Sequence, residues 1–230
     1  MDAYPCGARY SDLMRDAYHD DLAAVSATLV SMAAMVDNAI VRASKSLLES
    51  DRALAEEVIA ADAALDSVQH ELDNRTVDLM ARQAPVATDL RVLVTSLRMS
   101  ADLERMGDLA AHIAKAARMR FPACAVPVEL QMTILEMSRV ASDLVNKTAL
   151  VIRDRDIEGA LQVERDDDQM DRLHRQLFIT LLDPAWPHGI ETAIDVTLIG
   201  RYYERFADHA VSVSRRLYYS VTGEYAAPQN

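Results

Sequence analysis

One short pattern occurs twice in this chain, 100 residues apart. Residues 103–110 read Leu-Glu-Arg-Met-Gly-Asp-Leu-Ala, and residues 203–210 read Tyr-Glu-Arg-Phe-Ala-Asp-His-Ala. A longer match supports the repeat, because residues 58–72 align with residues 163–177 at a shift of 105, with two aspartates and four apolar residues in register. A tandem duplication tolerates such a five-residue difference as a deletion in a loop. We therefore expect two structural repeats.

The residues between these motifs predict helices. From residue 8 to residue 84 the chain contains no proline and no glycine. Long uninterrupted segments rich in Ala, Leu, Met, Arg and Glu favour helix over strand. In the first segment, apolar residues from Leu22 to Leu47 recur in alternating steps of three and four, which is typical of a helix that packs against other helices.

Breaks in this pattern divide the chain into six helices. Ser50-Asp51 is a plausible cap for the second helix, and Pro85 suits the first turn of the third. The segment 121–127 contains two prolines and is the main break, and the helices after it are expected over 128–153, 157–182 and 189–220.

We predict an all-α fold of two tandem three-helix bundles, placed end to end or side by side. The expected units are a mobile N-terminal tail of residues 1–10, a first repeat over residues 11–122 and a second repeat over residues 127–222.

The composition limits the class of protein. The chain has 230 residues, half of them apolar, and a formal charge of −12. Such a charge argues against nonspecific nucleic-acid binding, which needs a basic surface. No run of eighteen apolar residues predicts a membrane span, and the N-terminus does not resemble an export signal. Cys6 and Cys124 form neither a metal motif nor a disulfide framework, so we expect a cytoplasmic protein.

The repeated motif contains a pair of acids spaced by four residues. Glu104 with Asp108, and Glu204 with Asp208, project from one helix face about 6 Å apart. Two like charges so placed destabilise a helix by roughly 0.2–0.5 kcal/mol unless a cation lies between them. At about 100° per residue, both pairs continue apolar stripes, so we expect them to point inward.

A second pair of acids lies on the preceding helix of each repeat, next to its apolar stripe. A three-helix bundle places these aspartates opposite the Glu-x-x-x-Asp pair of the same repeat. Four carboxylates then meet in each half and suit Mg, Ca, Mn or iron rather than structural zinc. The eight candidate metal ligands are Asp62, Asp66, Glu104 and Asp108 in the first half, and Asp167, Asp171, Glu204 and Asp208 in the second. A salt-bridge network involving Arg105 and Arg205 is the alternative, and the sequence leaves both open.

These features together resemble the PhoU family of phosphate-specific transport system accessory proteins. The resemblance depends on the two Glu-Arg-x-x-Asp motifs, the two-by-three helix plan and residues 83–91, Gln-Ala-Pro-Val-Ala-Thr-Asp-Leu-Arg. It extends over about residues 15–220. The Pro-Val-Ala-x-Asp-Leu-Arg element occurs only in the first half, so any contact it makes is expected once.

The resemblance implies a function. It implies a non-enzymatic negative regulator of phosphate uptake and of the phosphate-starvation response, which contacts the ATPase subunit of the phosphate ABC transporter and a phosphate-responsive sensor histidine kinase. It also implies a homodimer, and a divalent metal or iron cluster at the Glu/Asp-x-x-x-Asp motifs.

Two other classes remain as alternatives. A ferritin-like or carboxylate-bridged oxidase needs Glu-x-x-His on two helices, and the nearest matches are Asp16-x-x-His19 and Asp171-x-x-His174. A plain coiled-coil scaffold needs no site at all. No Gly-rich phosphate loop or nucleophile motif is present in the sequence, so we expect neither an enzyme nor a direct phosphate pocket.

Overall fold

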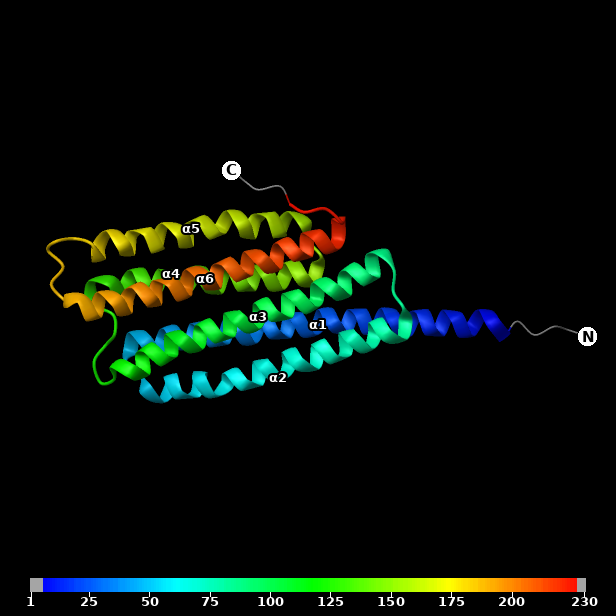
Figure 1. The fold of residues 1–230 in the computed structure, drawn as a ribbon, viewed down its shortest axis with the longest axis horizontal. Helices are drawn as coiled ribbons and strands as arrows, with labels where there is room; N and C mark the ends of the chain where they lie inside the picture. The colour runs from blue at the N-terminus through cyan, green and yellow to red at the C-terminus, as the bar shows by residue number, and fades with distance from the viewer. Residues whose placement is uncertain (1–5, 227–230) are drawn as a thin grey trace, which may run out of the picture.

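The protein consists of six long antiparallel helices in two layers of three (Figure 1). The computed structural model describes the backbone of residues 6–226 and the side chains of residues 18–226. The helices are α1 (Cys6–Glu49), α2 (Arg52–Gln83), α3 (Ala87–Arg120), α4 (Val128–Asp154), α5 (Ile157–Leu181) and α6 (Gly189–Thr222).

The predicted all-α fold with two three-helix repeats is confirmed, and residues 6–226 contain no strand. Helices α1–α3 form one bundle and α4–α6 the other, and the two lie side by side (Figure 1). The contacts between bundles run along α1 with α4 and along α3 with α6. Of the expected N-terminal tail, residues 6–10 belong to α1, and residues 1–5 lie outside the described part of the chain.

Local sequence explains the helix ends. The Asp51 side chain accepts a hydrogen bond from the Leu54 N–H at 3.0 Å, as expected for an N-cap. Ala84 takes a left-handed conformation, and its N–H closes α2 on the Met80 carbonyl before Pro85 prevents continuation. Gly223 ends α6 in the same way at φ 79°, a conformation that favours glycine.

The apolar stripe predicted for the first helix is the centre of the core. Five of its members are 1% exposed or less and pack against α2, α3 and α4, namely Leu29, Met32, Val36, Ala43 and Leu47, whereas Ala39 is only partly buried. One stretch of α1, Tyr18–Glu49, is long and apolar enough to span a membrane, with a mean hydropathy of 1.6. The core helix of a water-soluble bundle has the same properties, and here the stripe is covered by neighbouring helices.

Polar contacts join the two repeats at several depths. Between α1 and α4, Ser142 donates a hydrogen bond to Asp37. These two residues are equivalent under the 105-residue shift, so the pseudo-twofold axis of the duplication passes between them. Deeper in the core, the hydroxyls of Ser44 and Tyr203 lie 2.6 Å apart.

The contact between α3 and α6 contains a buried acid. Asp102 is 7% exposed, accepts a 2.6 Å hydrogen bond from Arg216 Nε and lies 3.0 Å from His209 Nδ1. A buried carboxylate is tolerated only when it is paired and hydrogen-bonded. This contact therefore fixes α6 against α3 at one register.

We predict that Asp102→Ala destabilises the protein by about 2–3 kcal/mol, because it leaves Arg216 without its partner inside the interface between repeats. Thermal unfolding should show a midpoint lower by about 5–10 °C. Asp78→Ala removes an exposed helix-surface pair with Arg82 and serves as the matched control, with an expected cost below about 0.5 kcal/mol. Equal losses in the two variants would contradict this role of Asp102.

Candidate functional site

The four acids of the first repeat lie on facing sides of α2 and α3. Asp62 and Asp66 are on α2, and Glu104 and Asp108 are on α3. Asp62 reaches the α3 backbone, because a Cβ placed on Gly107 would lie 3.4 Å from its Oδ1. Gly107 stands between Glu104 and Asp108 in the sequence, so Asp62 points to the surface between them. The sequence expectation that the two pairs face each other within one repeat agrees with this placement.

Burial and mutual repulsion both act on this first cluster. The pKa of Asp62 is raised, first by burial and then by the charges of Asp108 and Asp66. The pKa of Glu104 is also raised, first by burial and then by Asp108. Carboxylates with raised pKa values are held in a surrounding that disfavours their negative charge. The cluster therefore carries electrostatic strain.

The second repeat contains the same arrangement in a stronger form. Asp167 and Asp171 project from α5, and Glu204 and Asp208 project from α6. Burial, followed by the charges of Asp171, Asp208 and Glu204, raises the pKa of Asp167 to about 7. The pKa of Glu204 is raised for the same reasons, burial first and Asp208 second. The strain predicted from the sequence for four close acids is thus present in both halves.

Arginines pair with part of each cluster. Arg105 donates a 2.8 Å hydrogen bond to Asp108, and Arg201 forms an ion pair with Glu204. The expected arginine was Arg205, but Arg201 takes this position because it lies three residues before Glu204, on the same helix face. Both pairs lie within one helix, and among residues 18–226 the cluster aspartates of α2 and α5 have no cationic partner within salt-bridge distance, namely Asp62, Asp66, Asp167 and Asp171.

The side chains do not surround a common point. Among residues 18–226, no three His, Cys, Asp or Glu side chains are gathered closely enough to hold a metal ion. The donor set nevertheless suits a hard or borderline divalent cation, because each cluster offers four carboxylates whose repulsion a cation would offset.

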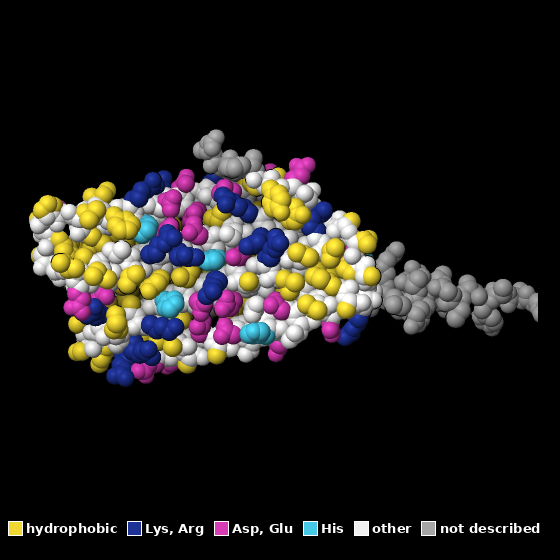
Figure 2. Space-filling view, in the orientation of Figure 1, with side chains coloured by type: hydrophobic (Ala, Val, Ile, Leu, Met, Phe, Trp, Pro, Cys, Tyr) yellow, Lys and Arg dark blue, Asp and Glu magenta, His cyan; other side chains and the backbone are white. Residues whose placement is uncertain are grey.

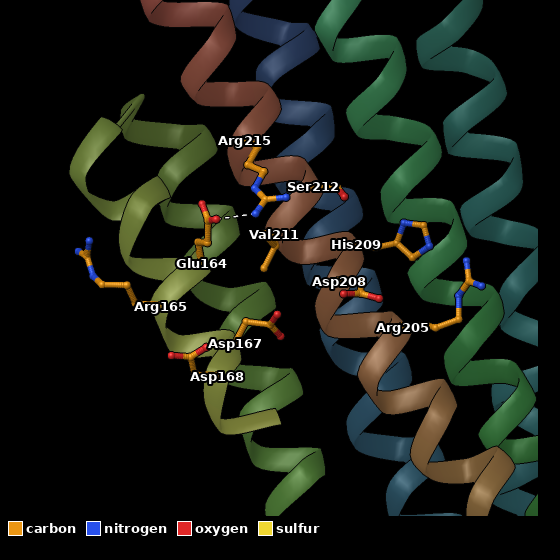
Figure 3. A pocket seen from close by; sticks show the side chains of 10 residues that line it. All are labelled: Glu164, Arg165, Asp167, Asp168, Arg205, Asp208, His209, Val211, Ser212 and Arg215. Atoms are coloured by element: carbon orange, nitrogen blue, oxygen red, sulfur yellow. Dashed lines mark hydrogen bonds and ion pairs between the residues drawn. The ribbon is translucent and has the colours of Figure 1, made fainter. Parts of the chain in front are cut away.

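The two clusters open onto different surfaces. The second borders a polar cavity of about 610 Å³ between α5 and α6, lined by Asp167 and Asp208 (Figure 3). Arg215 points across this cavity to Glu164, whereas Arg165 and Arg205 point away from it in opposite directions. The first cluster borders an apolar groove of about 370 Å³ between α1 and α2, lined by Asp62 and several alanines. A solute reaches the second cluster through polar surroundings only.

Sequence reasoning missed some polar residues near these clusters. His174 Nε2 is buried without a hydrogen-bond partner and lies against the α6 backbone, 3.8 Å from a Cβ placed on Gly200. His209 contacts Asp102, and His112 stacks on Tyr202 with ring centroids 5.3 Å apart. Asp102 lies within a line of buried residues on α3, and this position in the sequence could have indicated a buried acid.

The ferritin-like alternative is not supported by the arrangement of helices. Its two nearest motifs are Asp16-x-x-His19 on α1 and Asp171-x-x-His174 on α5. Helices α1 and α5 make no contact within residues 6–226. The two motifs therefore cannot supply ligands to one dinuclear centre.

Comparison with known proteins gives the same division into repeats. A family model described as "PhoU domain" matches residues 29–117 and again residues 134–217. The chain belongs to the PhoU family. The first matched segment lies within α1–α3 and the second within α4–α6, so each three-helix bundle of this PhoU-family protein contains one copy of the domain.

Relatives extend the match over nearly the whole chain. Phosphate-specific transport system accessory protein PhoU homolog 2 of Mycobacterium tuberculosis is 45% identical, over 92% of this chain and 100% of its own length. Homolog 1 of Mycobacterium leprae is 44% identical over 92% and 96%. Members of the family are regulatory accessory proteins and not enzymes.

Solved structures support the fold. The crystal structure of the phosphate transport system regulatory protein PhoU from Streptococcus pneumoniae has a TM-score of 0.81 at 23% identity, covering 92% of this chain and all of that one. PhoU from Pseudomonas aeruginosa has a TM-score of 0.79 at 24% identity, covering 90% and 100%. At these identities the likeness shows the fold alone.

We predict that Asp167→Asn stabilises this PhoU-family protein at pH 8 by about 1–2 kcal/mol, raising the unfolding midpoint by about 2–8 °C. The folded state raises the pKa of Asp167 from its ordinary 3.8 to about 7. The folded protein therefore binds the extra proton, and stability falls as the pH rises between those two values. The gain should disappear below about pH 3, where the carboxyl is mostly protonated in both states.

The control is Asp143→Asn, at an exposed position of α4, which should change stability by less than about 0.5 kcal/mol at either pH. Thermal unfolding in buffer with a chelator is the measurement. If Asp167→Asn instead destabilises the protein at pH 8, the negative charge of Asp167 is stabilised by its surroundings in the folded state and the prediction is wrong.

Proposed function

We propose that this protein is a cytoplasmic negative regulator of phosphate uptake and of the phosphate-starvation response. Within this proposal it is an adaptor between the ATPase subunit of the phosphate ABC transporter and a phosphate-responsive sensor histidine kinase, and it acts as a homodimer. The observation that carries the proposal is the 45% identity to a phosphate-specific transport system accessory protein over that relative's full length.

The architecture suits an adaptor. Six helices of 25 to 44 residues present long side faces, and the outer helices α2 and α5 each pack on one side only. The cavity beside the second cluster is lined mainly by charged side chains and does not form the apolar pocket usual for a small-molecule substrate. Both features favour binding of other proteins over catalysis.

We further propose that each acidic cluster binds a divalent cation. The residues that would hold it are Asp62, Asp66, Glu104 and Asp108 in the first repeat, and Asp167, Asp171, Glu204 and Asp208 in the second. The raised pKa values of Asp62 and Asp167 support this, because a cation removes the repulsion that raises them. A bound cation would tie α2 to α3 and α5 to α6.

We predict that Mn²⁺ stabilises the metal-free protein. At a concentration of one hundred times the dissociation constant the stabilisation is about 2.7 kcal/mol per site, which raises the unfolding midpoint by about 5–10 °C. Glu104→Gln with Asp108→Asn should remove one site, and Glu204→Gln with Asp208→Asn the other, as counted by calorimetric titration. The same heat of binding in a variant carrying all four substitutions would refute the proposed ligands.

We predict that deleting the gene causes expression of phosphate-uptake genes in phosphate-rich medium, and that the intact gene restores repression.

Purified protein should bind the transporter ATPase, as measured by biolayer interferometry with and without a chelator. Unchanged affinity in chelator would make the cation structural only. Glu104→Ala with Asp108→Ala tests the scaffold alternative, which requires full repression in that strain. The adaptor role would be contradicted if deletion of the gene abolishes repression but the purified protein binds neither the ATPase nor the kinase.

A further inference from the structure

Large apolar side chains are exposed where α5 ends and α6 begins. We call this surface the distal face. Ile190 is 80% exposed, Leu182 is 78% exposed and Ile179 is 75% exposed. Figure 2 shows hydrophobic side chains gathered over this end of the molecule, at the left of the view. The distal face consists of Phe178, Ile179, Leu182, Ile190, Ile194 and Leu198.

The six residues come from two adjacent antiparallel helices. Leu177 of α5 packs directly on Gly200 of α6, with 2.8 Å from its Cδ1 to a Cβ placed on that glycine. The connecting turn is fixed by Trp186, whose indole N–H donates a 2.9 Å hydrogen bond to the Gly189 carbonyl. The exposed residues therefore form two neighbouring ridges that the turn holds together.

Half of this apolar surface is particular to the second repeat, because Leu182, Ile190 and Ile194 correspond to the apolar residues Val77, Leu90 and Val94. Under the repeat shifts, Phe178 and Ile179 correspond to Asp73 and Asn74 of the first repeat. Leu198 corresponds to Arg98. The first repeat forms the same three-helix bundle with polar residues at these places. An exposed apolar patch that packing does not explain marks an interaction surface.

Arginines border the distal face on α5. Two arginines, Arg172 and Arg175, come before Ile179 and Leu182 in the sequence. Their spacing places all four residues on one face of α5. Both arginines are exposed, and within residues 18–226 neither has a carboxylate within salt-bridge distance. Their counterparts in the first repeat are Ser67 and His70. Two exposed arginines thus lie beside the apolar end of a protein with a charge of −12.

This charge pattern selects among occupants. An anionic membrane would attract the arginines but repel the acidic protein as a whole. A helix with an apolar stripe and an acidic flank fits this surface, because its apolar residues can pack against the ridges and its acidic residues can pair with the arginines.

We propose that the distal face binds an amphipathic helix of another protein, with apolar residues against the two ridges and acidic residues beside Arg172 and Arg175. This is the helix-in-groove mode, in which anchors at i, i+3, i+4 and i+7 supply affinity. The charged flank sets orientation and association rate. The proposal names the chemistry of a partner and does not depend on which process the protein regulates.

The test is a selection from displayed 18-residue amphipathic helices with randomised flanks. The full-length protein is the bait, and a variant with Ile179→Ser and Ile194→Ser is used for counter-selection. Enriched helices are expected to have acidic flanks and to bind the unaltered protein at least tenfold tighter than the variant by fluorescence anisotropy. Absence of enrichment, or enrichment of basic flanks, overturns the proposal.

Two further variants separate the contributions. Arg172→Glu with Arg175→Glu should weaken the selected acidic helices by at least tenfold and favour matched helices with lysine flanks. Val77→Ser, at the position of the first repeat that corresponds to Leu182, should leave binding unchanged. Circular dichroism confirms that each variant folds. If sedimentation shows a dimer that Ile179→Ser with Ile194→Ser abolishes, the face belongs to a second copy and the proposal is wrong.

Discussion

Apolar packing between the two repeats determines the rest of this structure. A three-helix unit with long apolar stripes cannot cover all of them alone, and here α1 packs on α4 while α3 packs on α6. Four helices then form the interior, and residues such as Met106 and Phe206 are fully buried. Helices α2 and α5 remain outside, each covered on one side. The acids lie where these outer helices pack against the interior ones.

The acidic clusters follow from that arrangement. An acid on the inner edge of α2 or α5 is half-buried against a neighbouring helix that also carries acids, so burial and repulsion act together. Similar acids on the open side of α5, such as Asp168, remain in water. Within one helix, an arginine three residues away compensates one acid of a pair, as Arg105 does for Asp108. The remaining negative charge supports the proposal that each cluster binds a divalent cation.

Sequence alone predicted the elements and the facing of the acids, because both depend on local periodicity. The stripe through Val36 and Ile40, and the steps from Asp62 to Asp66, are properties of one helix. Sequence could not decide whether the bundles lie end to end or side by side, since both bury similar stripes. Contacts across the repeats, such as Asp102 with Arg216, depend on that choice. For the same reason the contact of His209 with Asp102 could not be predicted.

The pseudo-twofold axis imposes its own requirement on the chain. In an assembly of two identical units, a residue on the axis meets a copy of itself. Two aspartates at that place would repel each other, and two serines would lack a strong acceptor. Fusion of the units into one chain lets the two positions diverge, and the present pair, Asp37 and Ser142, joins an acceptor to a donor. Covalent linkage thus lets two different residues meet at a point where a symmetric dimer places two copies of the same residue.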